Sequence, residues 1–466
     1  MKNVMSSSVE APSVEPPLDP SPLANKTLLS YGVGQTGAQL FRDMPAVLLP
    51  LFMTTMLGIS PWLAGIAVLI PKLWVIVCDP LVGALSDHYK PAWSRRPFLT
   101  IGAVVTGFSF IALFSFSEFA SPEVAAFTVA VLFLIASTAF SGFSVPYLAV
   151  ASELSDDAHE RTKVLSVRIV FAVIGVVMGV GLAQPMVFYL GGDAAAWRTM
   201  AIVFGVISML AMLTTAVAVP KNYGVAHHAD FKALFSRFSV VRHNTPFVVL
   251  TVAFLIQSVA QAIGYAVVGF VFLYAIEDVN LLLPFILVMA CGSISSQPLW
   301  LKASVRFGKE RAFWLACSGW LLVTLTWATL EAGPDAMIEM GYFGSFSAEH
   351  AGVLFRGFVI GVTNAAFSVL TFSMLTDTIV SQKIAHGSVD EGVYSGIFSA
   401  VEKLGFALGP MLSGIILSYA GFQASVGGAV AQSQTAIDGM VLSYSFVPAG
   451  IMALSLLVFS RYRVKI

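Results

Sequence analysis

Two ionisable residues lie inside a long apolar run, where a bilayer would solvate their charges poorly. Lys72 and Asp79 are seven positions apart in the stretch from Pro71 to Leu99, so a helix would present both on one face. Charged side chains in an apolar segment are costly and are therefore functional candidates by default. The chemistry to expect of a single carboxylate such as that of Asp79 is the uptake and release of a proton.

The composition of the chain is that of a membrane protein. Of its 466 residues, 57% are hydrophobic and 11% are charged, and the mean hydropathy is +0.84. Soluble proteins average about 25% charged residues. The net charge of −1 does not point to nucleic acid, and the three cysteines all lie in apolar runs, so we expect no disulfide and no metal site. No phosphate-binding glycine loop and no nucleophile–base pair stands out, so we expect neither an enzyme nor a cofactor.

Twelve apolar runs reach the length that a membrane-spanning helix needs, about 20 residues. We expect spans at 28–57, 62–86, 98–117, 123–150, 164–190, 197–219, 246–276, 280–301, 312–331, 350–376, 393–420 and 438–460. The predicted fold is an all-α membrane protein with twelve transmembrane helices in two six-helix halves. Its predicted parts are a disordered cytoplasmic tail (1–27), an N-terminal half (28–219), a cytoplasmic linker (220–245), a C-terminal half (246–460) and a cytoplasmic tail (461–466).

The distribution of basic residues predicts the orientation. Twenty of the 25 Lys and Arg residues fall in the tails and in alternate connections, whereas the opposite connections hold only Arg198. This asymmetry and the even number of spans predict that both termini are cytoplasmic. The four basic residues inside spans are Arg42, Lys72, Arg356 and Lys403.

Three stretches carry a family resemblance. After Asp79-Pro80 come Gly-x-x-Ser-Asp, a Trp and then Arg-Arg-Pro-Phe, and further matches lie at 145–168 and 377–410. This pattern resembles the glycoside–pentoside–hexuronide:cation symporter family of the major facilitator superfamily. The resemblance extends from Leu28 to Lys465. It implies alternating access about a central cavity between the two halves.

The resemblance implies roles for residues in the cation path. In the family, an aspartate before the proline of helix 2 takes part in cation binding, and a lysine of helix 11 is needed for transport. These positions match Asp79 and Lys403, and we add Asp43 of helix 1 as a third cation-coupling candidate. The alternative is a static buried ion pair that fixes helix packing.

The family resemblance also implies a sugar-binding site. Arg168 matches a sugar-contacting arginine of the family, and its planar fork can donate several hydrogen bonds to hydroxyls. Gln39 replaces a sugar-binding aspartate, and Asp43 lies on the same helix face four residues later. The alternatives are that Arg168 anchors a helix start and that Arg42 and Asp43 neutralise local partners such as Lys72. The expected substrate-binding residues are Gln39, Asp43, Lys72, Tyr147, Arg168, Asn364 and Lys403, and Gln257 and Gln261 are further hydrogen-bonding candidates.

Some positions depart from the family pattern. Leu148 and Ser368 replace tryptophans, and Ser144 replaces an aspartate, so the usual stacking rings for a pyranose are missing. Val75 replaces the second acid of helix 2. Because a sodium site needs several oxygen ligands whereas one carboxylate can take a proton, we favour a proton as the coupling ion, with sodium as the alternative.

A group of charges at the expected cytoplasmic side can act as a gate. We expect cross-loop pairs that hold the outward-facing state and break when the cavity opens inward; the alternative is a solvated, topology-setting loop. The predicted gate residues are Asp87, Arg95, Arg96, Glu153, Arg161 and Asp377.

The predicted function is cation-coupled symport of a sugar or glycoside, with a proton as the favoured coupling ion. The alternative on the same fold is an exporter or carrier of a lipid, drug or other amphipathic solute, which an apolar, Phe-rich cavity would favour. A membrane receptor or assembly factor is a third reading, and the intramembrane charges argue against it. The expected partners are a small-molecule substrate and the bilayer, in a monomer of the bacterial inner membrane.

Overall fold

The computed structural model describes residues 24–154, 158–218, 244–330, 338–339, 345–386 and 391–464. The N-terminal elements are α1 (Asn25–Thr55), α2 (Pro61–Trp93), α3 (Arg96–Leu113), α4 (Pro122–Glu153), α5 (Ala158–Val176), the π-helix η1 (Val177–Leu182), α6 (Ala183–Tyr189) and α7 (Ala194–Ala218). The predicted N-terminal tail up to residue 23 and most of the predicted linker lie outside the described residues.

The second half begins at Thr245. Its elements are α9 (Thr245–Phe270), the π-helix η2 (Val271–Ala275), the short 3₁₀ helix η3 (Val279–Leu281), α10 (Leu282–Phe307), α11 (Lys309–Leu325), the 3₁₀ turn η4 (Thr326–Thr329), α12 (Ala348–His386), α13 (Glu391–Tyr419), α14 (Gln434–Tyr444) and α15 (Phe446–Phe459). Two strands of two residues each, β1 (Ile338–Glu339) and β2 (Ser345–Phe346), pair antiparallel between η4 and α12.

Eleven helical segments among the described residues are long and apolar enough to cross a membrane. The exception among the expected twelve is α1, whose 31 residues include Gln35, Gln39, Arg42 and Asp43. A helix with these polar residues is stable inside a bundle because neighbouring helices, not lipid, surround it. The all-α membrane class is confirmed, with α1 as the twelfth long helix.

The helix ends follow from local sequence. Ser121 and Asn244 cap α4 and α9 by accepting hydrogen bonds from the backbone N–H of Val124 (3.4 Å) and Phe247 (3.1 Å). Several helices run past the predicted spans at the end that carries the C-terminus. For example, α2 continues to Trp93 and α12 to His386, because polar residues there need no lipid contact and the helix continues into water.

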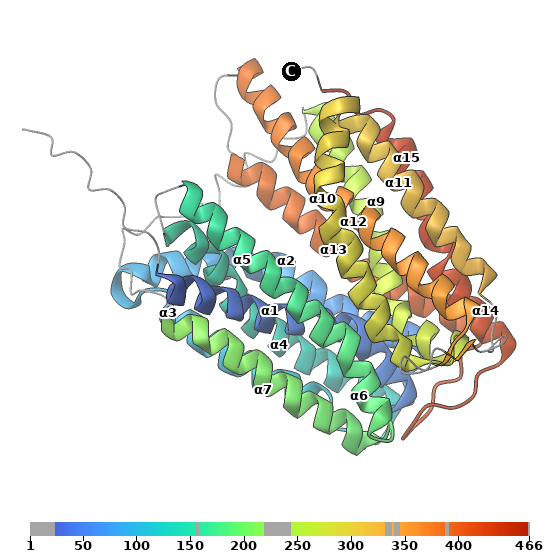
Figure 1. Ribbon diagram of the computed structural model, residues 1–466. Coiled ribbons are helices and arrows are strands. Elements are labelled where there is room, and N and C mark those ends of the chain that lie inside the picture. The colour runs from blue at the N-terminus through green and yellow to red at the C-terminus, as the bar shows by residue number, and fades with distance from the viewer. Residues whose placement is uncertain are drawn as a thin grey trace, which may run out of the picture.

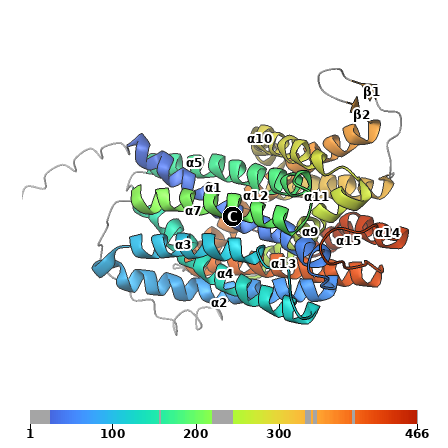
Figure 2. The ribbon, with the colours of Figure 1, turned by 90° about the horizontal axis from the view of Figure 1, so that it is seen from below.

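The central helix is α1, which packs against α5, α7 and α9 (Figure 2). Between Tyr31 and Leu57 its only exposed residue is Arg42. Because the helix is otherwise enclosed by protein, this charged side chain faces a space inside the bundle and not the lipid.

The two halves converge at one end of the molecule and separate toward the end that carries the C-terminus (Figure 1). We call the converging end the closed end. There the α1–α2 connection pairs with the segment after α13 through backbone hydrogen bonds such as Gly58 N–H to Ser425 O (2.9 Å) and Ser425 N–H to Thr54 O (2.9 Å). Gln184 also donates to the carbonyl of Gly269 at 2.8 Å.

A close crossing of α2 and α13 continues this contact. Gly65 faces the backbone of Met411, where an added Cβ would lie 2.7 Å from the Met411 Cα, and Gly414 abuts the backbone of Pro61. Only glycine allows the two backbones to approach this closely. The crossing brings α2 and α13, which carry Asp79 and Lys403, side by side.

Candidate functional site

A ladder of hydrogen bonds runs along one face of α1. Gln35, Gln39 and Asp43 are spaced by four residues, so they lie on successive turns of the same face. The amide of Gln35 donates to Gln39 Oε1 (3.1 Å), and the amide of Gln39 donates to Asp43 Oδ2 (2.6 Å). Arg168 of α5 begins the ladder by donating from Nε to Gln35 Oε1 at 2.9 Å. We call these four residues the α1 ladder.

The α1 ladder brings together three predicted substrate-binding residues, Gln39, Asp43 and Arg168. Gln35 was not predicted, although its position one turn before Gln39 could have indicated it. The close approach of α5 depends on Gly175, where an added Cβ would lie 2.6 Å from Cβ of Gln39. A side chain at Gly175 would displace Gln39.

Asp43 also belongs to a charged cluster in the middle of the bundle. Nε of Arg42 lies 3.4 Å from Asp43 Oδ1, and the Arg42 side chain is 59% exposed to the internal space while that of Asp43 is 9% exposed. Lys72 interacts electrostatically with Asp43 and places its ammonium 5.8 Å from the ring centre of Phe133. Glu402 of α13 interacts with Arg42 from the other half and is a residue that sequence reasoning missed.

The Asp79 carboxylate and the Lys403 ammonium form an ion pair between α2 and α13. This pair joins the two halves of the molecule. Asp79 is 15% exposed and Lys403 37% exposed in their side chains, and Asp79 Oδ1 is buried with no hydrogen-bond partner among the described residues. The site therefore keeps one carboxylate oxygen available for a cation.

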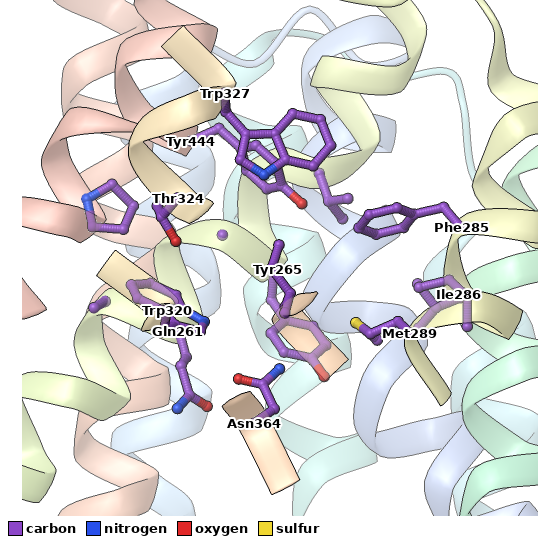
Figure 3. Close-up of a pocket in the computed structure, with 16 residues that line it drawn as sticks. Gln261, Tyr265, Phe285, Ile286, Met289, Trp320, Thr324, Trp327, Asn364 and Tyr444 are labelled. Atoms are coloured by element: carbon purple, nitrogen blue, oxygen red, sulfur yellow. The ribbon is translucent and has the colours of Figure 1, made fainter. Parts of the chain in front are cut away.

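A pocket of about 640 Å³ lies on the side of the C-terminal half (Figure 3). Its walls come from α9, α10, α11 with η4, α12 and α14 with the start of α15, and Val180 of η1 is a contribution from the N-terminal half. The aromatic lining residues are Tyr265, Phe285, Trp320, Trp327 and Tyr444, and the polar ones are Gln261, Thr324 and Asn364. We call this the aromatic pocket.

Two of the predicted substrate-binding candidates, Asn364 and Gln261, line the aromatic pocket together with aromatic residues that the sequence analysis did not single out. Leu148 and Ser368 are not among its lining residues, and its rings come from α9, α10, α11 with η4, and α14. Gln257, the other glutamine of α9 that was expected near the substrate, is 1% exposed and points to Sγ of Cys317 at 3.5 Å, within the C-terminal half.

Comparison with known proteins identifies the family to which this chain belongs. The family model described as MFS/sugar transport protein matches residues 30–465. The chain belongs to this family. It is 21% identical to the inner membrane symporter YicJ of Escherichia coli, with 94% of this chain and 92% of the relative covered. It is 22% identical to the isoprimeverose transporter of Lactiplantibacillus pentosus, with 94% and 88% covered.

The fold has close counterparts among solved structures. A mutant of the nucleoside transporter NupG superposes with a TM-score of 0.68 at 14% identity, covering 94% of this chain and 99% of the other. At this identity the likeness concerns the fold alone. The protein is thus a multi-pass integral membrane protein of the MFS/sugar transport family, and the predicted family resemblance is confirmed.

Tyr147 lies apart from the aromatic pocket in this MFS protein. Its ring stacks on Tyr31 of α1 with centroids 4.3 Å apart. The Tyr147 hydroxyl donates to the Tyr31 carbonyl at 2.9 Å, and the Tyr31 hydroxyl donates to the Tyr147 carbonyl at 3.2 Å. Tyr147 is 1% exposed, so it fastens α4 to α1 here and offers no face to a substrate.

Four of the predicted gate residues, Asp87, Arg95, Arg96 and Asp377, make contacts within their own halves among the described residues. Arg95 donates to Asp87 Oδ1 and to Ser86 Oγ, both at 2.6 Å, and Arg96 donates to the carbonyl of Val217 at 2.8 Å. In the other half Lys309, which was not predicted, binds both oxygens of Asp377 at 2.7 and 2.6 Å.

The two remaining gate candidates, Glu153 and Arg161, have side chains that lie outside the described part of the structure. The cross-loop gate therefore stays a prediction. The observed contacts brace each half at the end where the halves separate.

Proposed function

We propose that the protein is a secondary active transporter that moves a sugar or glycoside together with a cation by alternating access. The observation that carries this proposal is the Asp79–Lys403 pair, which joins the two halves, with the α1 ladder in the N-terminal half and the aromatic pocket on the side of the C-terminal half. Family membership supports transport, and the names of the relatives include a symporter and an isoprimeverose transporter.

The chemistry of the α1 ladder suits a sugar. Amide and guanidinium groups donate and accept hydrogen bonds in directions that hydroxyls can satisfy. A substrate hydroxyl, which both donates and accepts, can take the place of Gln35 as a partner of Arg168 or of Gln39 as a partner of Asp43. A purely apolar solute would break these bonds without replacing them, which disfavours the lipid or drug carrier as the alternative function.

Asp79 is the proposed cation site, with Lys403 as its counter-charge. A proton from one side neutralises the carboxylate and frees the Lys403 ammonium, and loss of the proton to the other side restores the ion pair. Oδ1 of Asp79, which has no hydrogen-bond partner within the described ranges, supports this role. Val75, one turn before Asp79, supplies no second carboxylate, so we propose a proton and keep sodium as the alternative. Asp43 is the second group that this exchange can involve.

The orientation is also a proposal. The end that carries the C-terminus holds the basic connections, so we place it in the cytoplasm of a bacterium, with the protein in the inner membrane as a monomer. The closed end then faces outward, and the structure corresponds to an inward-facing state.

The orientation is tested by labelling. A polar maleimide should modify an exposed residue of the closed end, Ala431→Cys, in intact cells, and should modify Lys302→Cys only after permeabilisation. The parent protein with its three native cysteines is the control. The reverse pattern would invert the proposed topology.

The transport function is tested in proteoliposomes. Purified protein should accumulate at least one member of a panel of labelled sugars and glycosides when a pH gradient is imposed, and vesicles without protein should not. Accumulation driven only by a sodium gradient would replace the proton with sodium. Failure of every sugar under both gradients would overturn the proposal.

A further inference from the structure

The helix α11 ends in a turn of different geometry, the 3₁₀ segment η4, which carries Trp327 between two threonines. In a 3₁₀ helix the side chains of residues three apart eclipse one another. Thr326 and Thr329 therefore place their hydroxyls on one face of η4. Trp327, one residue after Thr326, lies roughly a third of a turn away, on a different face.

The side chain of Arg356, on α12, contacts both hydroxyls. Its Nε donates to Thr326 Oγ1 and its Nη2 to Thr329 Oγ1, each at 3.3 Å. Each hydroxyl in turn donates to a backbone carbonyl three residues earlier, Thr326 to that of Val323 at 2.6 Å and Thr329 to that of Thr326 at 2.8 Å. Because a hydroxyl donates one proton and accepts through its lone pairs, all four bonds are satisfied in one direction. The guanidinium thus bridges two hydroxyls that the 3₁₀ form aligns.

Glu349, near the start of α12, pairs with the same guanidinium. Its Oε1 lies 2.8 Å from Nη1 of Arg356, and the side chains of Arg356 and Glu349 are only 12% and 25% exposed. Three nitrogens of the guanidinium therefore have acceptors, one on α12 and two on η4. Because the guanidinium is planar and rigid, these three bonds fix its orientation. We call Arg356 with Glu349, Thr326 and Thr329 the Arg356 clamp.

The fixed guanidinium lies close to the indole of Trp327. Its Cζ is 5.5 Å from the ring centre, which is within the range of a cation–π attraction. The same indole meets the rings of Tyr444 and Phe285 edge-on, with centroids 4.8 and 5.9 Å apart. Trp327 is 1% exposed. The clamp and the two rings together therefore determine where the indole lies.

The position of this indole shapes the aromatic pocket. Trp327 lines the pocket, and Figure 3 shows its nitrogen directed into it. Asn364 lines the same pocket from α12, eight residues after Arg356, whereas Arg356 itself is not among the described residues that line it. The Arg356 clamp ties α12 to η4, so it holds the indole donor of one wall in place relative to the amide of the other.

We propose that Arg356 is a positioning residue for substrate recognition, which keeps η4 in its 3₁₀ form and thereby fixes Trp327 in the wall of the aromatic pocket. This inference rests on the proposed transport function. It explains a basic residue inside a span without a part in cation movement, in contrast to Lys403. A preorganised wall gives higher affinity because less ordering remains for the substrate to impose.

The first test observes the indole directly and needs no substrate. The full-length protein is labelled with 5-fluorotryptophan, and the fluorine NMR signal that disappears in Trp327→Phe is assigned to Trp327. In Arg356→Gln this signal should shift or broaden, because the cation leaves the ring and η4 is no longer held. The signal of Trp93, assigned through Trp93→Phe, is the control, because Trp93 lies on α2 in the other half and is 59% exposed. An unchanged Trp327 signal would overturn the proposal.

The second test separates recognition from coupling. Arg356→Gln should raise the KM for a transported sugar about 3-fold to 10-fold and leave the maximal rate and the number of cations moved with each sugar unchanged. Arg356→Lys keeps a charge near the ring but not the planar set of donors, so it should recover part of the affinity. A lower maximal rate or a loss of coupling at unchanged KM would assign Arg356 to the cation path and overturn the proposal.

Threonine variants distinguish the clamp from a general effect on folding. Thr329→Val keeps the shape of the side chain but removes the hydroxyl, whereas Thr329→Ser keeps the hydroxyl. Thr329→Val should move the Trp327 signal and raise the KM about 2-fold to 3-fold, and Thr329→Ser should behave as the unaltered protein. This pair carries the test if Arg356→Gln fails to fold, and equal behaviour of its two members would overturn the clamp. Absence of transport of every sugar by the unaltered protein would overturn the proposed function, and the fluorine signal would then decide the clamp by itself.

Discussion

The site has an N-terminal wall, formed by the α1 ladder, and a C-terminal wall, formed by the aromatic pocket. The two walls differ in whether their polar groups have hydrogen-bond partners. In the N-terminal wall, Arg168, Gln35, Gln39 and Asp43 bond to one another. In the C-terminal wall, Thr324, Trp327 and Asn364 each have a polar atom without a hydrogen-bond partner in the part of the chain that the structure describes. A substrate must exchange bonds with the first wall but can add bonds to the second. The N-terminal wall can therefore change its hydrogen bonds when a substrate binds, as coupling requires, whereas the C-terminal wall is preorganised for recognition.

The largest effect should come from breaking the link between the walls. Lys403→Ala leaves the Asp79 carboxylate without its counter-charge. Removing one partner of a buried ion pair costs about 3–5 kcal/mol, and the partial exposure of Lys403 reduces this, so we expect a loss of about 2 kcal/mol and severely impaired transport. Chemical denaturation in detergent would measure the loss of stability.

The matched control is Lys302→Ala, an exposed lysine at the end of the molecule that carries the C-terminus. The double variant Asp79→Ala with Lys403→Ala should be more stable than the sum of the single effects, because neither charge is left alone. Strictly additive losses would show that the pair does not couple the walls.

The second effect concerns the start of the α1 ladder. Arg168→Ala removes a charged donor and leaves Gln35 Oε1 without it. Hydrogen bonds to charged groups contribute about 1.5–3 kcal/mol, so substrate affinity should fall about 10-fold to 100-fold while the amount of folded protein changes little. Titration of purified protein measures this, with Arg198→Ala as the control. Normal affinity of Arg168→Ala would remove Arg168 from the substrate site.

A smaller effect is expected in the middle of the ladder. Gln39→Ala removes a neutral amide, which contributes about 0.5–1.5 kcal/mol, so affinity should fall about 3-fold to 10-fold. The comparison variant is Gln257→Ala, whose amide points to Cys317 within the C-terminal half, and it should change affinity less than Gln39→Ala. A larger loss for Gln257→Ala would reverse our assignment of the two glutamines.

Much of this arrangement could be predicted from single residues. Charges inside apolar runs identified Asp79, Lys403 and the Arg42–Asp43 pair, and i,i+4 spacing placed Asp43 with Gln39. Tyr147 shows why a family motif does not determine the position of a side chain. The motif assigns Tyr147 to its place in the chain, but stacking on the ring of Tyr31 determines where its side chain lies. Trp327, Tyr444 and Glu402 could not be predicted. Aromatic residues are frequent throughout this apolar chain, and only the packing of distant helices selects the few that meet at one pocket.

The most direct test of the coupled account is the proton movement that accompanies the sugar. A transported sugar is added to a weakly buffered suspension of de-energised cells or right-side-out vesicles that contain the protein, and the external pH is recorded. We expect a transient rise in external pH when sugar enters, because each proton that enters with it leaves the medium. Asp79→Asn, which keeps the size of the side chain but cannot exchange a proton, should allow sugar exchange without the pH change. Sugar entry by the unaltered protein without any pH change, or an undiminished pH change in Asp79→Asn, would contradict the account.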